Sequence, residues 1–251
     1  MRVTPQIIAH RGGGGETLEN TRESIGYALS QKVSRYETDV RALKDGTVVL
    51  QHDSQLTSPW GDFRTVGELT SQEFFALRGS AGQRPISLKA ALEDFPTLAY
   101  NVDIKEPRAL EGALRAVSDA DAWERVVFSS FSSRTLAKLR KRHPGAQTCL
   151  SPVEVVQALV AAHSASNLHF DSAGAFAQVP LKWKGITVVD RVFVSWCHSQ
   201  GIKVEPWTIN EQTEMLQLAD LGVDAVMTDY PALAKAVFTA RSATYPDTLR
   251  V

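Results

Sequence analysis

The chain has 251 residues, of which 43% are apolar and 22% are charged, values typical of a globular protein with a sizeable core. Its net charge of −1 gives no electrostatic reason to expect nucleic acid or an anionic membrane as a partner. Cys149 and Cys197 lie far apart without CxxC spacing, so neither a disulfide framework nor a zinc site is indicated. The chain begins MRVTPQIIAHRG, without the apolar region of a signal peptide, and no apolar run approaches the roughly 20 residues of a spanning helix. We therefore expect a cytoplasmic protein without stable membrane insertion.

The first fifth of the chain alternates strand and helix patterns. An apolar strand is predicted over residues 6–10, and a helix follows from Asn20, which can act as the N-cap with Glu23 three residues later. Residues 36–40 and 47–52 have the composition of two strands, and the sequence KDGT between them predicts a turn. We therefore expect one strand, one helix and two further strands before residue 53.

The middle of the chain continues the alternation. Thr70 and Glu73 form a capping box before a short helix, and Ser87 precedes apolar residues with the i, i+3, i+4, i+7 spacing of a helix. Three strand patterns are each followed by a helix pattern, with the strands at residues 98–105, 126–131 and 147–151 and the helices at residues 108–119, 132–142 and 152–163.

The C-terminal part begins with a weaker strand signal at residues 167–171, and the helix that answers it includes residues 190–200. A strand at residues 203–209 then precedes a helix with Asn210 as its N-cap and Gly222 as its C-terminal stop. The last pair is a strand at residues 224–229 and a helix that runs to about Arg241, with Asp229 as a candidate cap.

Roughly eight strands thus alternate with helices, in a chain of the length typical of a (β/α)₈ barrel. We predict an α/β fold with a single (β/α)₈ TIM barrel and a small insertion after the second strand region. The barrel forms one domain over residues 1–251, with its core at about residues 5–240. A doubly wound open sheet is the alternative, but no GxGxxG motif follows the first strand.

Charged side chains recur where the predicted strands end, which is where function resides in such barrels. Glu37 and Asp39 are two residues apart on one strand, so both side chains point to the same face. Asp103 and Lys105 have the same spacing on another strand. Charges inside apolar strands are costly to bury unless they are paired or bind a metal. The remaining candidates at strand ends are His10, Arg11, His52, Asp53 and Trp207.

These residue types favour a phosphoryl centre. Three carboxylates without a thiolate suit a hard divalent cation, Mg²⁺ or Ca²⁺. Two histidines suit acid–base catalysis, in which one accepts a proton while the other donates one. Arg11 and Lys105 supply positive charge for the oxygens of a phosphate. The alternative without a metal is a buried salt bridge, in which these two cations neutralise Glu37 and Asp39.

The motifs HRGGGGETLENT, ETDV, KDGTVVLQHD, VDIK, WTIN and TDYP occur in this order between residues 10 and 231. In this ordered set the sequence resembles the glycerophosphodiester phosphodiesterases, a family of metal-dependent barrels that cleave glycerophosphodiesters to glycerol 3-phosphate and an alcohol. The resemblance implies four sets of site residues: the acid–base pair His10 and His52; the substrate-binding and phosphate-binding residues Arg11, Lys105 and Trp207; the metal ligands Glu37, Asp39 and Asp103; and a supporting shell of Glu19 and Asn20.

Three positions depart from the family's pattern. Leu18 replaces a proline, the second histidine is not followed by the usual Arg-Thr pair, and Asp103 stands where glutamate is usual. In having an aspartate at this position, the sequence resembles the related sphingomyelinase D-type phospholipases. One alternative is therefore a phospholipase D-like enzyme that cleaves lysophospholipids. A membrane-facing apolar loop would support it, and the candidate segment over residues 58–77 contains Trp60 and Phe63 but also several charges.

A second alternative is a catalytically silent barrel that binds phosphodiesters. Such a protein is expected to have lost a histidine or a carboxylate, and this sequence retains all five of the candidate residues of those types. In each case the partner is a small phosphodiester. The residues leave open its head group, the choice between Mg²⁺ and Ca²⁺, the nucleophile (water or a substrate hydroxyl) and the oligomeric state.

Overall fold

The computed structural model describes residues 4–164 and 174–244. Its main sheet contains the strands β1 (Gln6–Ala9), β2 (Arg35–Ala42), β3 (Val48–Leu50), β4 (Tyr100–Ile104), β5 (Val126–Ser129), β6 (Gln147–Thr148) and β11 (Ala225–Thr228). Six of these strands are parallel and lie in the order β11-β1-β2-β4-β5-β6, while β3 pairs with β2 in the antiparallel direction. Parallel strands that follow one another in this order need crossover connections, and helices supply them.

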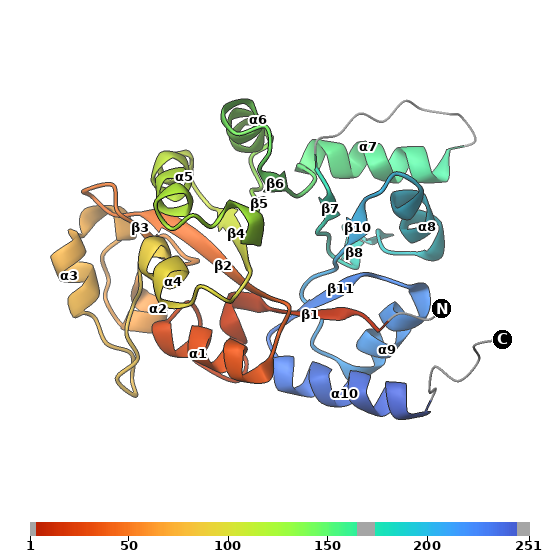
Figure 1. Cartoon of the computed structure of the whole chain (residues 1–251), viewed down its shortest axis with the longest axis horizontal. Coiled ribbons are helices and arrows are strands. Elements are labelled where there is room, and N and C mark those ends of the chain that lie inside the picture. Colours follow the sequence, from red (N-terminus) through yellow and green to blue (C-terminus); the bar gives the residue numbers. More distant parts are fainter. Residues whose placement is uncertain (1–3, 165–173, 245–251) are drawn as a thin grey trace.

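Four short strands lie outside this sheet. β7 (Phe176–Ala177) pairs in parallel with β10 (Lys203–Val204), and β8 (Lys182–Trp183) forms an antiparallel hairpin with β9 (Ile186–Thr187). The result is an α/β fold whose parallel sheet curls into a half-barrel (Figure 1). The α/β fold with a parallel sheet is confirmed, whereas the complete eight-stranded barrel stays a prediction. The strand predicted at residues 167–171 lies outside the described residues.

Helices connect the strands as the alternation predicts. They are α1 (Arg22–Gln31), α2 (Thr57–Trp60), α3 (Ser71–Ala76), α4 (Leu88–Asp94), α5 (Leu110–Asp119), α6 (Ser133–Arg142), α7 (Pro152–His163), α8 (Arg191–Ser199), α9 (Gln212–Leu221) and α10 (Pro231–Thr244). Short 3₁₀ turns lie at His10–Gly12, Val66–Glu68, Pro107–Ala109 and Trp123–Arg125. The capping box of Thr70 and Glu73 is confirmed at the start of α3, and Gly222 ends α9 in the left-handed conformation.

Two asparagines that the sequence predicts as helix caps have a different role. The N-cap of α1 is Thr21, and α9 starts after Glu211 without a side-chain cap. Asn20 and Asn210 each stand one residue before the cap position. Their side-chain amides bond to carboxylates at the candidate site instead.

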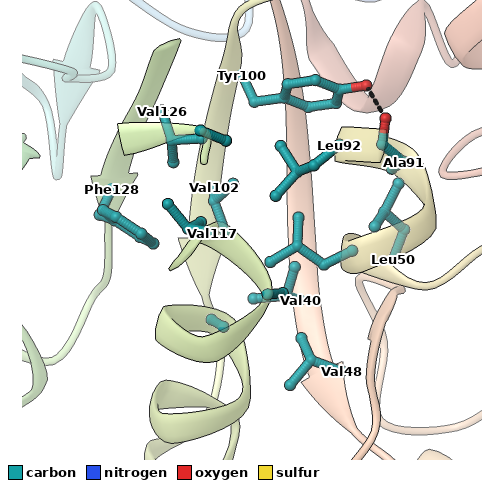
Figure 2. Close-up of a cluster of buried hydrophobic side chains, with 14 of the residues drawn as sticks. Val40, Val48, Leu50, Ala91, Leu92, Tyr100, Val102, Val117, Val126 and Phe128 are labelled. Atoms are coloured by element: carbon teal, nitrogen blue, oxygen red, sulfur yellow. Dashed lines mark hydrogen bonds between the residues drawn. The ribbon is translucent and has the colours of Figure 1, made fainter. Parts of the chain in front are cut away.

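The outer face of the sheet packs against α4 and α5 (Figure 2). The hydroxyl of Tyr100 on β4 donates a hydrogen bond to the backbone carbonyl of Ala91 on α4 at 2.7 Å. Complete burial of one apolar side chain in such a cluster stabilises the fold by about 1.5–3 kcal/mol. The cluster holds β2, β4 and β5 in place, and its buried members include Val40, Val102, Val117, Val126 and Phe128. The opposite face of β2 and β4 carries the charged candidates Glu37, Asp39 and Asp103.

The predicted insertion follows β2 and has its own small core. Leu56, Trp60 and Phe74 are buried there, and the indole N–H of Trp60 donates to Oε1 of Gln51 at 2.9 Å. Phe63 is 87% exposed. Of the two aromatic residues in the candidate membrane-facing segment, Phe63 is therefore at the surface, whereas Trp60 packs inside the core of the insertion. None of the described helices has the length and apolar character required to cross a membrane.

Candidate active site

The three candidate metal-binding carboxylates lie on two neighbouring strands. β2 and β4 pair so that Asp39 stands opposite Asp103, and Glu37 stands opposite Asn101. Because these positions are two residues apart on each strand, all four side chains are on the same face of the sheet. All three carboxylate side chains are buried. The sequence spacing therefore predicted their common face, and the strand register brings them together.

Each candidate catalytic histidine is held by an aspartate. His10 follows β1, and its Nδ1 lies 2.6 Å from Oδ1 of Asp229 at the end of β11. His52 follows β3, and its Nδ1 lies 2.7 Å from Oδ1 of Asp53. A carboxylate at Nδ1 fixes the orientation of the ring and leaves Nε2 to exchange protons. The Nε2 atom of His10 lies 4.0 Å from Oε2 of Glu37, so this ring joins β11 to the carboxylate cluster.

Close packing requires glycine at particular positions of the run after His10. Gly12 has φ of +87°, and a Cβ atom there would lie 2.5 Å from the ring of Tyr36 and 2.7 Å from Ser24. Only glycine therefore allows the turn to approach α1 and β2 so closely. Gly14 is less constrained, since a Cβ atom there would meet its nearest neighbour at 3.6 Å, an ordinary contact distance. The turn places His10 and Arg11 beside the end of β2.

The two predicted phosphate-binding residues contact carboxylates. Nη1 of Arg11 donates to the Glu19 carboxylate at 3.1 and 3.2 Å, and Nε of Arg11 lies 3.3 Å from Oδ2 of Asp39. Nζ of Lys105 lies 2.7 Å from an oxygen of Asp39 and 2.7 Å from an oxygen of Asp103. The buried salt-bridge arrangement is thus present at Asp39, which pairs with both cations.

Glu37 is in a different position. It accepts a hydrogen bond from the backbone N–H of Arg11 at 3.0 Å, but no Arg or Lys side chain pairs with it in the part of the chain that the structure describes. Burial raises the pKa of Glu37 to about 8, and the neighbouring charge of Asp39 adds to the rise. Burial also opposes ionisation of Asp39, but Lys105 and Arg11 outweigh it and lower the pKa of that carboxyl. Glu37 therefore needs additional positive charge to ionise at neutral pH.

Asp103 is also incompletely compensated. Burial raises the pKa of Asp103 although Lys105 opposes the rise, and its buried Oδ1 atom has no hydrogen-bond partner among the described residues. An unpartnered carboxylate oxygen beside two further carboxylates fits a cation that takes oxygen ligands. Within residues 4–164 and 174–244, however, no three His, Cys, Asp or Glu side chains are already arranged to hold a metal ion. Lys105 contacts both Asp39 and Asp103, so a cation that used both would require its ammonium group to move.

The predicted residues share one cavity of about 400 Å³. Those that line it are His10, Arg11, Glu37, Asp39, His52, Asp103, Lys105 and Trp207. Glu19 and Asn20 stand behind this lining: Glu19 pairs with Arg11, and Nδ2 of Asn20 donates to Oδ2 of Asp39 at 3.2 Å. The structure thus brings together the eight lining residues and places the two predicted supporting residues next to them.

Sequence reasoning missed several partners in this site. Asp229 contacts His10 and accepts a hydrogen bond from Nδ2 of Asn210 at 2.8 Å, where the sequence suggested only a helix cap. Phe131 lies edge-on to Trp207, with their ring centroids 6.0 Å apart. Nζ of Lys105 lies 5.5 Å from the centroid of the Phe131 ring. The available signal for Asp229 and Asn210 was their place in the TDYP and WTIN motifs, whereas Phe131 belongs to no motif.

Comparison with known proteins places the chain in a family. The profile of the glycerophosphoryl diester phosphodiesterase family matches residues 10–111 and 102–233. A probable glycerophosphodiester phosphodiesterase 2 of Mycobacterium tuberculosis is 29% identical over 239 residues, which are 93% of this chain and 90% of that protein. A lysophospholipase D of Rattus norvegicus is 26% identical, over 97% of this chain and 89% of its own length.

A solved structure has the same fold. It is a phosphodiesterase of Oleispira antarctica in complex with its product sn-glycerol 3-phosphate, with a TM-score of 0.76 and 23% identity over 94% of this chain and 97% of that chain. The family profile alone covers far more than half of the 251 residues. The chain therefore belongs to the glycerophosphoryl diester phosphodiesterase family and is, as a member of it, a phosphodiesterase.

Proposed function

We propose that this protein hydrolyses glycerophosphodiesters to glycerol 3-phosphate and an alcohol, with His10 and His52 as the acid–base pair and a divalent cation as cofactor. The observation that carries the proposal is the shared cavity, in which two oriented histidines and three buried carboxylates meet. The family and the named product of its structural neighbour support the substrate class.

The histidines have complementary roles in this reaction. One Nε2 accepts the proton of the attacking hydroxyl, and the other donates a proton to the alcohol that leaves phosphorus. Asp229 and Asp53 keep both rings oriented during the transfer. The overall reaction adds water across one P–O bond, so the phosphate keeps the new oxygen and the alcohol leaves with a proton.

Positive charge is needed because a phosphodiester is an anion and gains charge on its non-bridging oxygens during attack. Arg11 and Lys105 line the cavity and can bind these oxygens. We propose that Mg²⁺ or Ca²⁺ is held by Glu37, Asp39 and Asp103, and that it supplies further positive charge to the phosphate when bound. The unpartnered Oδ1 of Asp103 and the raised pKa of Glu37 support this set.

We also propose that β7 and β10 close the curled sheet into a complete (β/α)₈ barrel. The backbone N–H of Leu150, just after β6, donates to the carbonyl of Phe176 on β7 at 2.8 Å. The N–H of Asp224, just before β11, donates to the carbonyl of Val204 on β10 at 2.9 Å. Because β7 also pairs with β10, these bonds link the two edges of the six-stranded parallel sheet. The closed barrel would be the single domain predicted over residues 1–251, with its core at about residues 5–240.

The proposed reaction is tested by release of glycerol 3-phosphate from glycerophosphocholine and glycerophosphoethanolamine, with EDTA, Mg²⁺ or Ca²⁺ present. We expect metal-dependent release that is lost in His10→Ala and in His52→Ala. His198→Ala is the matched control, because His198 also pairs with an aspartate but does not line the cavity. A wild-type protein that releases nothing from either substrate with either ion would contradict the proposal. Full activity after exhaustive chelation with EDTA would contradict the proposed metal cofactor and leave the proposed hydrolysis standing.

A further inference from the structure

Three uncharged polar side chains form a hydrogen-bonded row in the cavity, and the proposed reaction does not use them. Asn101 on β4, Ser129 on β5 and Gln178 just after β7 all line the cavity. Nε2 of Gln178 donates to Oδ1 of Asn101 at 2.7 Å, and Nδ2 of Asn101 donates to Oγ of Ser129 at 3.3 Å. Asn101 stands two residues before Asp103 on the strand, so it lies deeper in the fold, away from the carboxyl end of β4.

A buried ion pair fixes the orientation of the Gln178 amide. Nε2 of Gln178 also donates to Oε2 of Glu205 at 2.9 Å, and Oε1 of Glu205 pairs with Nη2 of Arg35. Glu205 is 1% exposed and does not line the cavity. If the amide were flipped, Oε1 of Gln178 would face this carboxylate and Oδ1 of Asn101, and neither group has a hydrogen to donate. The amide therefore has one favourable orientation.

In this orientation Gln178 offers a ligand only a hydrogen-bond acceptor. Both N–H groups of its amide are engaged, one by Asn101 and one by Glu205. Its Oε1 atom has no partner among the described residues, and it is not one of their buried unpartnered atoms. Because the carbonyl oxygen of an amide is an acceptor without charge, it suits a hydroxyl group and discriminates against a ligand that lacks one.

The glycerol end of a glycerophosphodiester carries two free hydroxyl groups. The hydroxyl on the middle carbon is next to the phosphoester and is a candidate nucleophile, which needs a base rather than an amide oxygen. The terminal hydroxyl is one carbon further from phosphorus, as Gln178 belongs to the deeper row of side chains. The terminal hydroxyl therefore matches Gln178 in both chemistry and position.

We propose that Gln178 is a specificity-determining residue, whose Oε1 accepts a hydrogen bond from the terminal hydroxyl of the glycerol. Glu205, paired with Arg35, is the positioning residue that keeps the Gln178 amide in its accepting orientation. This inference rests on the proposed function and names a residue that selects the substrate at the same site. No covalent bond changes at Gln178.

The test compares glycerophosphocholine with 2-hydroxypropyl phosphocholine, an analogue that lacks only the terminal hydroxyl. Choline release measures cleavage of the same P–O bond in both, and the analogue keeps the middle hydroxyl in case this group is the nucleophile. With the wild-type protein we expect kcat/KM to be about 3- to 10-fold higher for glycerophosphocholine, the effect of one uncharged hydrogen bond. This ratio does not depend on the fraction of the protein that is folded.

Gln178→Met removes the amide at nearly constant side-chain length, and we expect it to cleave the two substrates with nearly equal kcat/KM. Glu205→Gln tests the positioning role, because an amide at this place can face either orientation of Gln178. We expect it to reduce the preference in part. Gln147→Met is the matched control, since Gln147 lies on β6 but does not line the cavity. It should keep the wild-type ratio.

The outcomes separate this inference from the proposed function. Hydrolysis of both substrates at equal kcat/KM by the wild-type protein, or the same ratio in Gln178→Met and Gln147→Met, would overturn the role of Gln178 and leave the proposed function standing. An unchanged ratio in Glu205→Gln would overturn the positioning role alone. No hydrolysis of either substrate would overturn the proposed function, and this inference with it. A preference that is lost in Gln178→Met and kept in Gln147→Met would support the assignment.

Discussion

Nδ1 of His10 and Oδ1 of Asp229 lie 2.6 Å apart although 219 residues separate them in the chain. The pair connects the end of β1 to the end of β11, and Asn210 holds the same carboxylate from the loop before α9. Burial opposes protonation of His10, but the hydrogen bond with Asp229 and the charge of Glu37 outweigh it and raise the pKa of this imidazole. Asp229 is therefore a positioning residue for His10.

Asp229→Asn is expected to lower kcat by about 10- to 100-fold with little change in KM, because the ring loses its orienting acceptor. It should also lower the pKa of His10, so the limb of the pH–rate profile that this group controls should move to lower pH. Kinetics across pH measure both effects. Asp224→Asn is the control, since Asp224 pairs with His198 away from the cavity. Equal losses in the two variants would contradict the positioning role.

Gly12→Ala is expected to destabilise the protein by about 3 kcal/mol or more, because the added methyl meets Tyr36 and Ser24 in addition to the unfavourable positive φ. Gly46→Ala is the matched control. Gly46 has φ of +85° in the turn between β2 and β3, and nothing lies within 4 Å of its added Cβ. It should cost only about 1–2 kcal/mol. Urea unfolding gives both values, and similar losses would show that the close packing at Gly12 contributes nothing.

Without a bound metal ion, the protein's free energy of unfolding should fall as pH rises from about 4.5 to about 8. The pKa of Glu37 is raised to about 8 from an ordinary value of 4.5, so between these values the folded state binds more protons than the unfolded state. Stability therefore decreases with pH in this interval. Urea unfolding in EDTA measures the slope, and Glu37→Gln should reduce it. An unchanged slope in Glu37→Gln would show that another group is responsible.

If the proposed cation binds, it should counteract this loss. Mg²⁺ or Ca²⁺ requires the ionised carboxylates, so its affinity should rise with pH up to about 8 and then level off. The added ion should raise the melting temperature more at about pH 8 than two pH units lower. Calorimetric titration in buffers of different ionisation enthalpy counts the protons released. Binding with the same affinity and no proton release across this range would contradict the involvement of Glu37.

Arg35→Ala is expected to cost about 3–5 kcal/mol, because it leaves the buried carboxylate of Glu205 without its cationic partner. This ion pair joins β2 to the segment just after β10 and so connects the two sheets. Arg22→Ala is the control, since Arg22 and Asp94 form a pair that is well exposed to solvent. An exposed pair contributes about 1 kcal/mol or less. Thermal or urea unfolding compares them, and equal losses would mean that Arg35 does not compensate a buried charge.

Much of the site was predictable because its residues lie in short patterns. Residues two apart on a strand share a face, so the spacing of Glu37 and Asp39 was sufficient to predict that they point the same way. The helices were predictable from apolar spacing and from capping residues such as Thr70. The caps at Asn20 and Asn210 were placed one residue early, because both amides bond to carboxylates that the local sequence cannot reveal.

The sequence by itself determined the alternation of strands and helices, the charged pairs on single strands and the family motifs, since each depends on residues close together in the chain. Tertiary structure alone decided the rest: that Asp229 holds His10, that Trp60 is buried, and that Glu205 orients Gln178 in the cavity. These relationships join residues far apart in the chain. Local propensity and periodicity carry no information about which distant surfaces meet, because that is set by the packing of whole elements around the sheet.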